Sequence, residues 1–157
     1  MKNCCFTGHR TISNENTRLH IELEDELCRL IENGVTNFYA GGAIGWDMLC
    51  SYTVCILRKR YPDITLNLIL PCAVEQQCFK WSKQQKRQFY ILSGYADSVE
   101  YIGEQYYHGC MKERNQRLVD NADICVCYYD IRNFRSGTGQ TVRMAERKSI
   151  EIINLYK

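Results

Sequence analysis

Short apolar stretches alternate with longer amphipathic stretches along the chain. The apolar stretches predict strands over residues 3–7, 36–40, 65–70, 98–102, 122–128 and 149–155. Between them, apolar residues recur at helical spacing, as in the series Leu19, Leu23, Leu27 and Leu30. One continuous helix is predicted from about Val74 to Leu92. Strands that alternate with helices indicate an α/β fold, in which a mostly parallel sheet is covered on both faces.

The predicted elements follow one another without a linker, a repeat or a low-complexity segment. A chain of 157 residues fits one domain, so we predict a single domain over residues 1–157. Parallel sheets bind ligands beyond the carboxyl ends of their strands, where the strand order reverses. The glycine-rich and polar motifs follow predicted strands, so we expect them to lie together at that edge.

Three turns place glycine beside the end of a predicted strand or at the start of a helix. They are Gly8-His9-Arg10, Gly41-Gly42 with Gly45, and Ser136-Gly137-Thr138. Glycine lets a ligand approach the backbone, and a helix that starts at such a turn directs unpaired N–H groups at the same place. The turns therefore predict seats for a phosphate. Neither the complete P-loop motif nor the G-x-G-x-x-G motif is present, so spacing alone does not define the ligand.

Five other side chains are candidates for the same site, and each has a structural explanation as well. Asp47 either stabilises a helix dipole or accepts a hydrogen bond from a ribose hydroxyl. Gln77 and Trp81 are spaced to share a helix face, where Trp81 either stacks on a base or packs in the core. Arg114 and Asn115 either contact the ligand or form an ordinary polar helix face. No nucleophile–base pair can be drawn, so the catalytic residues stay unassigned.

The net charge of +2 argues against a protein that grips nucleic acid through many phosphates. The ten cysteines include no C-x-x-C pair, and their spacing favours reduced apolar fillers over a disulfide framework or a metal site. We therefore expect no metal and no cofactor. The first residues lack the pattern of a signal peptide and no apolar run is long enough to span a bilayer, so a cytoplasmic protein without membrane contact is expected.

Several motifs occur together in an order that resembles one family. They are Phe6-Thr7-Gly8-His9-Arg10, Gly41-Gly42-Ala43-x-Gly45-x-Asp47, Leu70-Pro71-Cys72, Gln77-x-x-x-Trp81, Arg114-Asn115-x-x-Leu118-Val119-Asp120-x-Ala122-Asp123 and Ser136-Gly137-Thr138. The ordered set is similar to the YpsA/YoqJ-like branch of the SLOG superfamily. The superfamily also includes DprA and the LOG phosphoribohydrolases. The resemblance covers nearly the whole chain.

The resemblance implies a Rossmann-like three-layer sandwich with a pocket for a nucleotide-derived ligand. By position it makes Gly8, His9, Arg10, Gly41, Gly42, Gly45, Asp47, Gln77, Trp81, Arg114, Asn115, Ser136, Gly137 and Thr138 the ligand-binding candidates. The phosphoribohydrolase branch has a catalytic glutamate after its Gly-x-Gly-Thr motif, and Thr141 stands in its place here. The expected function is therefore the binding of a small phosphorylated nucleoside or nucleotide, in a sensor or regulator rather than an enzyme. The alternatives are a divergent N-glycosidic hydrolase and a DprA-like module for single-stranded DNA, and a homo-oligomer is left open.

Overall fold

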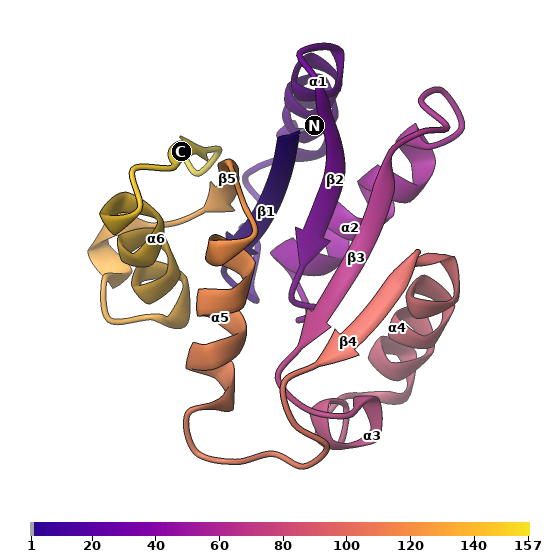
Figure 1. Ribbon diagram of the computed structural model, residues 1–157, viewed down its shortest axis with the longest axis vertical. Helices are drawn as coiled ribbons and strands as arrows, with labels where there is room; N and C mark the ends of the chain where they lie inside the picture. The colour runs from indigo at the N-terminus through magenta and orange to yellow at the C-terminus, as the bar shows by residue number, and fades with distance from the viewer. Residues whose placement is uncertain (1) are drawn as a thin grey trace.

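The six predicted strands pair side by side in one sheet. In the computed structural model, which describes residues 2–157, they are β1 (Lys2–Gly8), β2 (Val35–Ala40), β3 (Thr65–Leu70), β4 (Ser98–Tyr101), β5 (Ile124–Tyr128) and β6 (Glu151–Asn154). Every neighbouring pair is parallel. The α/β prediction is confirmed, and the sheet is fully rather than mostly parallel (Figure 1).

The strand order is β4-β3-β2-β1-β5-β6. The chain first builds outward from β1 to β4, and then returns to the other side of β1 to add β5 and β6. The order therefore reverses between β1 and β5, whose carboxyl ends lie next to each other through the pairing of Gly8 with Tyr128. This reversal is the place where parallel sheets leave a crevice for ligands.

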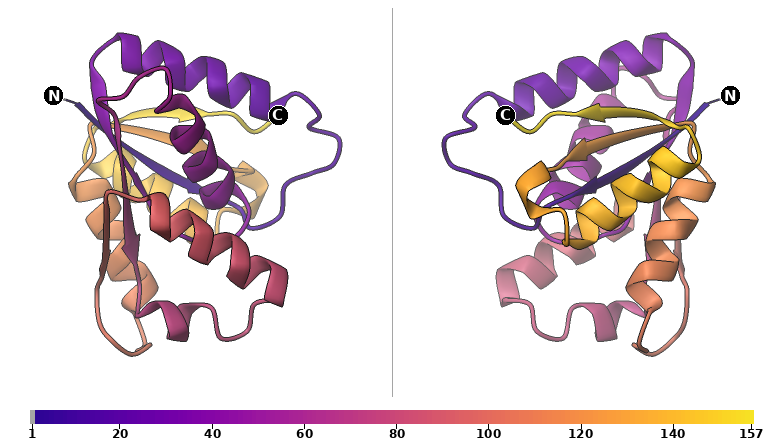
Figure 2. Two further views of the ribbon diagram at one scale, coloured as in Figure 1. Left: turned by 90° about the vertical axis from the view of Figure 1, so that its right-hand side faces the viewer. Right: turned by 90° about the vertical axis from the view of Figure 1, so that its left-hand side faces the viewer.

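The helices form one layer on each face of the sheet. Each layer packs on its own core cluster. One face is covered by α1 (Leu19–Glu32), α2 (Trp46–Leu57) and α4 (Lys83–Tyr95). The other face is covered by α5 (Cys110–Asp120) and α6 (Gly137–Arg147). Figure 2 shows the two layers from either side. The remaining helical segments are the short α3 (Val74–Gln77) and a 3-10 turn, η1 (Ile131–Asn133). No helix in the described part of the chain is both long and apolar enough to cross a membrane.

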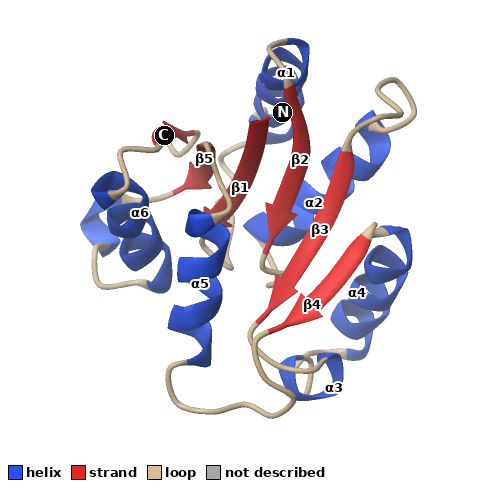
Figure 3. Cartoon of the chain, viewed as in Figure 1, coloured by secondary structure: helices blue, strands red, loops and turns tan. Residues whose placement is uncertain are grey.

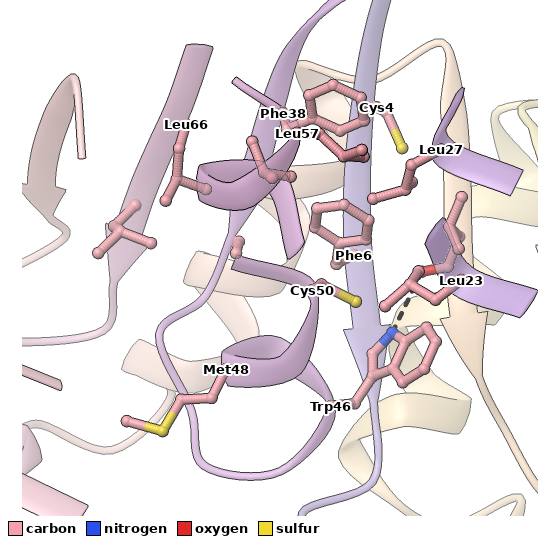
Figure 4. Close-up of a cluster of buried hydrophobic side chains, with 14 of the residues drawn as sticks. Cys4, Phe6, Leu23, Leu27, Phe38, Trp46, Met48, Cys50, Leu57 and Leu66 are labelled. Atoms are coloured by element: carbon pink, nitrogen blue, oxygen red, sulfur yellow. Dashed lines mark hydrogen bonds between the residues drawn. The ribbon is translucent and has the colours of Figure 1, made fainter. Parts of the chain in front are cut away.

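The larger core lies between the sheet and the α1, α2 and α4 layer. Alternate residues of the strands, such as Phe6 and Phe38, face it, and their rings are stacked with centroids 5.8 Å apart. Trp46, at the start of α2, is fully buried here, and its indole Nε1 donates to the carbonyl oxygen of Val126 at 3.4 Å (Figure 4). Burial of this one side chain fixes the beginning of α2 against β1 and β5.

The prediction of one helix from Val74 to Leu92 was wrong, because the chain forms two helices separated by a turn (Figure 3). Ser82 begins α4 with a capping box: its hydroxyl accepts a hydrogen bond from the Gln85 amide, and the Gln85 side chain accepts one from the Ser82 amide. This reciprocal pairing satisfies two amides that a continuous helix would have used internally. Gln77 and Trp81 therefore do not share a helix face.

Candidate functional site

A cavity opens at the carboxyl ends of β1 and β5, where the strand order reverses. Its volume is about 380 Å³, and we call it the inner cavity. Its walls come from the β1–α1 loop, the first turn of α2, one face of α5 and the start of α6. Most of the predicted site residues line it, namely Gly8, His9, Arg10, Asp47, Arg114, Asn115, Ser136, Gly137 and Thr138.

His9 and Arg10 follow β1 directly. The backbone amide of Asp130 donates to Nε2 of His9 at 2.9 Å, so this nitrogen is an acceptor and the ring proton lies on Nδ1. Burial lowers the pKa of His9, and the charge of Asp130 only partly opposes this effect. A neutral His9 can donate one hydrogen bond from Nδ1. The exposed Arg10 adds a permanent cation beside it.

The start of α6 faces the same cavity. The Ser136 hydroxyl caps the helix by accepting from the Gly139 amide at 3.0 Å. The amides of Gly137 and Thr138 come before the first intrahelical hydrogen bonds, and they carry the positive end of the helix dipole. A Cβ added at Gly137 would meet no atom within 4 Å, so a ligand can reach this backbone. The arrangement is suited to an anion.

Asp47 lies in the first turn of α2 and is only 6% exposed. Its Oδ2 accepts a hydrogen bond from the Ala43 amide at 3.3 Å, whereas its buried Oδ1 has no partner. Burial raises the pKa of Asp47 from its usual 3.8 to about 6, even though the nearby Arg114 guanidinium acts in the opposite direction. The free oxygen is therefore a strong hydrogen-bond acceptor inside the cavity wall.

Arg114 is a buried cation on α5, 5% exposed. Its Nη1 donates to the carbonyl oxygen of Gly41 at 2.5 Å, and its Nε donates to Oδ1 of Asn115 at 2.9 Å. The ion pairs of residues 2–157 all involve side chains that reach solvent, and none joins Arg114 to Asp47. The two buried charges therefore attract each other across Gly41 without direct contact.

The glycines of the second turn lie behind the cavity wall. A Cβ at Gly41 would meet the Arg114 guanidinium at 2.4 Å, and one at Gly42 would meet Leu70 at 2.6 Å. Gly45 has a φ of +84°, and a Cβ there would meet the carbonyl oxygen of Arg10 at 2.3 Å. These glycines thus allow protein segments to pack closely. The Asp47 carboxylate accepts the hydrogen bond of the Ala43 amide, which lies within the turn predicted to seat a phosphate.

Gln77 and Trp81 line a second, narrow cavity of about 50 Å³, which we call the throat. It shares Arg10, Ala43, Met111 and Arg114 with the inner cavity. Nε2 of Gln77 donates to the carbonyl oxygen of Gly42 at 2.9 Å, which holds the glycine turn in place. The Trp81 ring packs edge-on against Phe89 with centroids 5.7 Å apart, so part of this side chain serves the core.

Sequence reasoning missed Met111, which lines both cavities. Its position carried a signal, because Met111, Arg114, Asn115 and Leu118 are spaced to share one helix face, and all four line the inner cavity. It also missed Tyr106, on the loop between β4 and α5, which lines the throat. That loop has no periodic pattern to indicate where it runs.

The cysteines add no reactive centre to the site. Among residues 2–157, no three His, Cys, Asp or Glu side chains gather in a way that would hold a metal ion. Burial raises the pKa of Cys72 and of Cys78, the latter to about 11, which keeps these thiols protonated at neutral pH.

Comparisons with known proteins identify relatives of the whole domain. The sequence profile of the YspA SLOG family matches residues 5–156. An uncharacterized SPbeta prophage-derived protein of Bacillus subtilis, YoqJ, is 26% identical over an alignment of 144 residues, and the alignment covers 81% of this chain and 82% of YoqJ. A UPF0398 protein of Halalkalibacterium halodurans is 28% identical over an alignment of 125 residues, and the alignment covers 78% of this chain and 63% of that protein. The chain thus spans less than two thirds of the UPF0398 protein's length.

Among solved structures, the X-ray structure of TM1055, a structural genomics target, superimposes with a TM-score of 0.58 and 20% sequence identity. The match covers 97% of this chain and 72% of TM1055. At this identity the likeness supports the fold alone.

Proposed function

The chain belongs to the YspA SLOG family, and we propose that its inner cavity binds a small phosphorylated nucleoside or nucleotide as part of a sensing or regulatory role. The observation that carries the proposal is the meeting of three features in one cavity at the reversal of strand order. These are the free start of α6, the cation Arg10, and the buried carboxylate Asp47 with an unpaired oxygen.

The phosphate has a suitable place between α6 and the β1–α1 loop. The Gly137 and Thr138 amides supply oriented donors, and Arg10 supplies a guanidinium that matches phosphate geometry. His9 adds a donor through Nδ1. Together these groups offer more donors than acceptors, which suits a ligand end that carries only acceptor oxygens.

The ribose has a suitable partner in Asp47. Oδ1 of Asp47 is buried without a partner, and a buried polar atom of this kind costs free energy until it accepts a hydrogen bond. Because Asp47 lines the inner cavity, a sugar hydroxyl bound there supplies that donor once the carboxylate turns Oδ1 toward it. The fold therefore offers phosphate donors at one part of the cavity and a hydroxyl acceptor at another, which is the pattern of a phosphorylated nucleoside.

The proposal is tested by thermal unfolding with AMP, ADP-ribose, NAD, cyclic AMP and a short single-stranded oligonucleotide. A ligand at 100 times its Kd should stabilise the protein by about 2.7 kcal/mol. Arg10→Ala should abolish that shift, because it removes an exposed cation of the cavity that the core does not use. Arg147→Ala removes another exposed arginine, at the far end of α6, and should leave the shift intact.

Two results would contradict the proposal: no small ligand raises the melting temperature, or Arg10→Ala retains the full shift. Stabilisation by the oligonucleotide alone, lost steeply with added salt, would instead support the DNA-binding alternative.

A second candidate function is hydrolysis of the N-glycosidic bond of a nucleoside monophosphate. It is favoured by the position of Asp47, whose raised pKa of about 6 suits a general base near neutral pH. Water would add to C1′ as the C1′–N bond breaks, with Asp47 taking a proton from the water. The departing base would gain a proton from solvent, and Asp47 would then release its own proton to solvent. Thr141 cannot replace the missing glutamate, since its hydroxyl is buried and donates to the Gly137 carbonyl oxygen.

This candidate predicts that AMP yields free adenine and ribose 5-phosphate, detected by chromatography. Asp47→Asn should abolish release of the base while AMP still binds. If the wild-type protein releases no adenine during prolonged incubation, the hydrolase is excluded and the binding function is unaffected.

A further inference from the structure

The throat adjoins a third cavity as well as the inner one. This outer cavity has a volume of about 600 Å³ and is lined by Gln76, Phe79, Lys80 and Tyr106. The throat shares Arg10 and Arg114 with the inner cavity, and it shares Tyr106 with the outer one. The three cavities therefore follow one another along the carboxyl edge of the sheet.

Two aromatic side chains in the outer cavity are not used by the core. Phe79 is 76% exposed and Tyr106 is 62% exposed. Large apolar groups gathered at a surface cavity indicate an interaction site more often than isolated exposed ones do. Trp81, the stacking candidate from sequence, lines the throat and packs edge-on against Phe89.

Phe79 and Tyr106 come from different loops, and a backbone hydrogen bond links the two loops. Phe79 lies in the turn between α3 and α4, and Tyr106 lies in the loop between β4 and α5. These segments run close together at the lower edge in Figure 1. The Ala73 amide, just before α3, donates to the carbonyl oxygen of Glu104 at 3.0 Å, which ties the second loop to the first. This backbone hydrogen bond thus holds the two loops together, and the rings of Phe79 and Tyr106 line the same cavity.

The polar groups of the outer cavity are few and are mainly donors. Lys80 offers an ammonium, and Gln76 offers an amide that can both donate and accept. Aromatic walls with a small number of polar groups suit a flat heteroaromatic ring, which stacks by its faces and forms hydrogen bonds by its edge.

We propose that the outer cavity holds the base of the nucleotide whose phosphate lies against Arg10 and α6, with Phe79 and Tyr106 as the stacking side chains. The inference rests on the proposed function, because it requires a phosphate in the inner cavity. It adds the part of the ligand that enters the throat and the residues that distinguish a nucleotide from a sugar phosphate.

The test compares ligands with and without a base by isothermal titration calorimetry. The probes are the four common nucleoside 5′-monophosphates and ribose 5-phosphate. At least one nucleotide should bind the wild-type protein about ten-fold more tightly than ribose 5-phosphate, as expected for base stacking. The double variant Phe79→Ala/Tyr106→Ala should lose this advantage and keep its affinity for ribose 5-phosphate. Tyr95→Ala, which truncates a tyrosine of matching 63% exposure outside the three cavities, should keep it.

The outcomes separate the two proposals. If ribose 5-phosphate and every nucleotide bind equally, or if the double variant keeps the advantage of the nucleotide, the base site is wrong and phosphate binding stands. If neither ribose 5-phosphate nor any nucleotide binds the wild-type protein, the proposed function fails and the base site fails with it.

Discussion

Gly45→Ala should destabilise the protein by about 3–4 kcal/mol. The residue has a φ of +84°, and an added Cβ would lie 2.3 Å from the carbonyl oxygen of Arg10. That contact joins the two turns of the site, because the adjacent Trp46 amide donates to the His9 carbonyl oxygen at 3.2 Å. The variant should therefore also displace Arg10 and lose ligand-dependent stabilisation. Chemical denaturation measures the first effect, and thermal shift measures the second.

Two other glycines serve as controls for this experiment. Gly34 has a φ of +104° with no atom within 4 Å of an added Cβ, so Gly34→Ala reports backbone strain alone, about 1–2 kcal/mol. Gly94, in α4, has open space and no positive φ, so Gly94→Ala should be neutral or slightly stabilising. If Gly45→Ala costs no more than Gly34→Ala, the packing of Gly45 against Arg10 is not a constraint on the fold.

Arg114→Met should destabilise the protein by about 3 kcal/mol at pH 8. The change removes the donor to the Gly41 carbonyl oxygen and leaves the buried Asp47 carboxylate with only the weaker attraction of Arg10. Arg117→Met is the matched control, because Arg117 lies on the same helix but is half exposed and pairs with Glu100 at the surface. Surface pairs of this kind contribute about 0–1 kcal/mol.

The destabilisation by Arg114→Met should depend on pH. The pKa of Asp47 in the folded protein, about 6, is above its usual 3.8. The contribution of Asp47 to the free energy of unfolding is thus fully present below its usual pKa of 3.8, and it is lost as the pH rises through about 6. Without the guanidinium the pKa rises further, so the variant should lose more at pH 8 than at pH 5. The double variant Asp47→Asn/Arg114→Met should recover part of the loss, and an equal loss at both pH values would contradict the coupling.

Local pattern sufficed to predict most of the fold. The patterns of apolar residues located all six strands and most of the helices, because most elements bury one or both faces and their sequences show which residues are buried. The error at Val74–Leu92 came from a local competition. The helical pattern is present on both sides of Ser82, but α3 already ends at Gln77 and the capping box of Ser82 begins a new helix.

The sequence could also predict that these turns gather at one edge of the sheet, since glycine and hydroxyl residues follow β1 and β2 and precede α6. It could not predict which turn leaves its amides available. Ser136-Gly137-Thr138 opens into the inner cavity, whereas the turn at Gly41-Gly42 is covered by Arg114 and Leu70 from distant elements. Nothing within either turn distinguishes the two cases, because the difference lies in what packs against them.

The sequence by itself therefore determined an α/β domain, the alternation of its elements and the motifs at one edge of its sheet. These features depend on the repeat of apolar residues, every two residues in a strand and every 3.6 in a helix, and on the backbone freedom of glycine. Residues close together in the chain encode both properties. Only the tertiary structure decided the strand order, the burial of Asp47 beside Arg114 and the approach of Phe79 to Tyr106. Each of these joins segments far apart in the chain, and their contact depends on the packing of the whole domain.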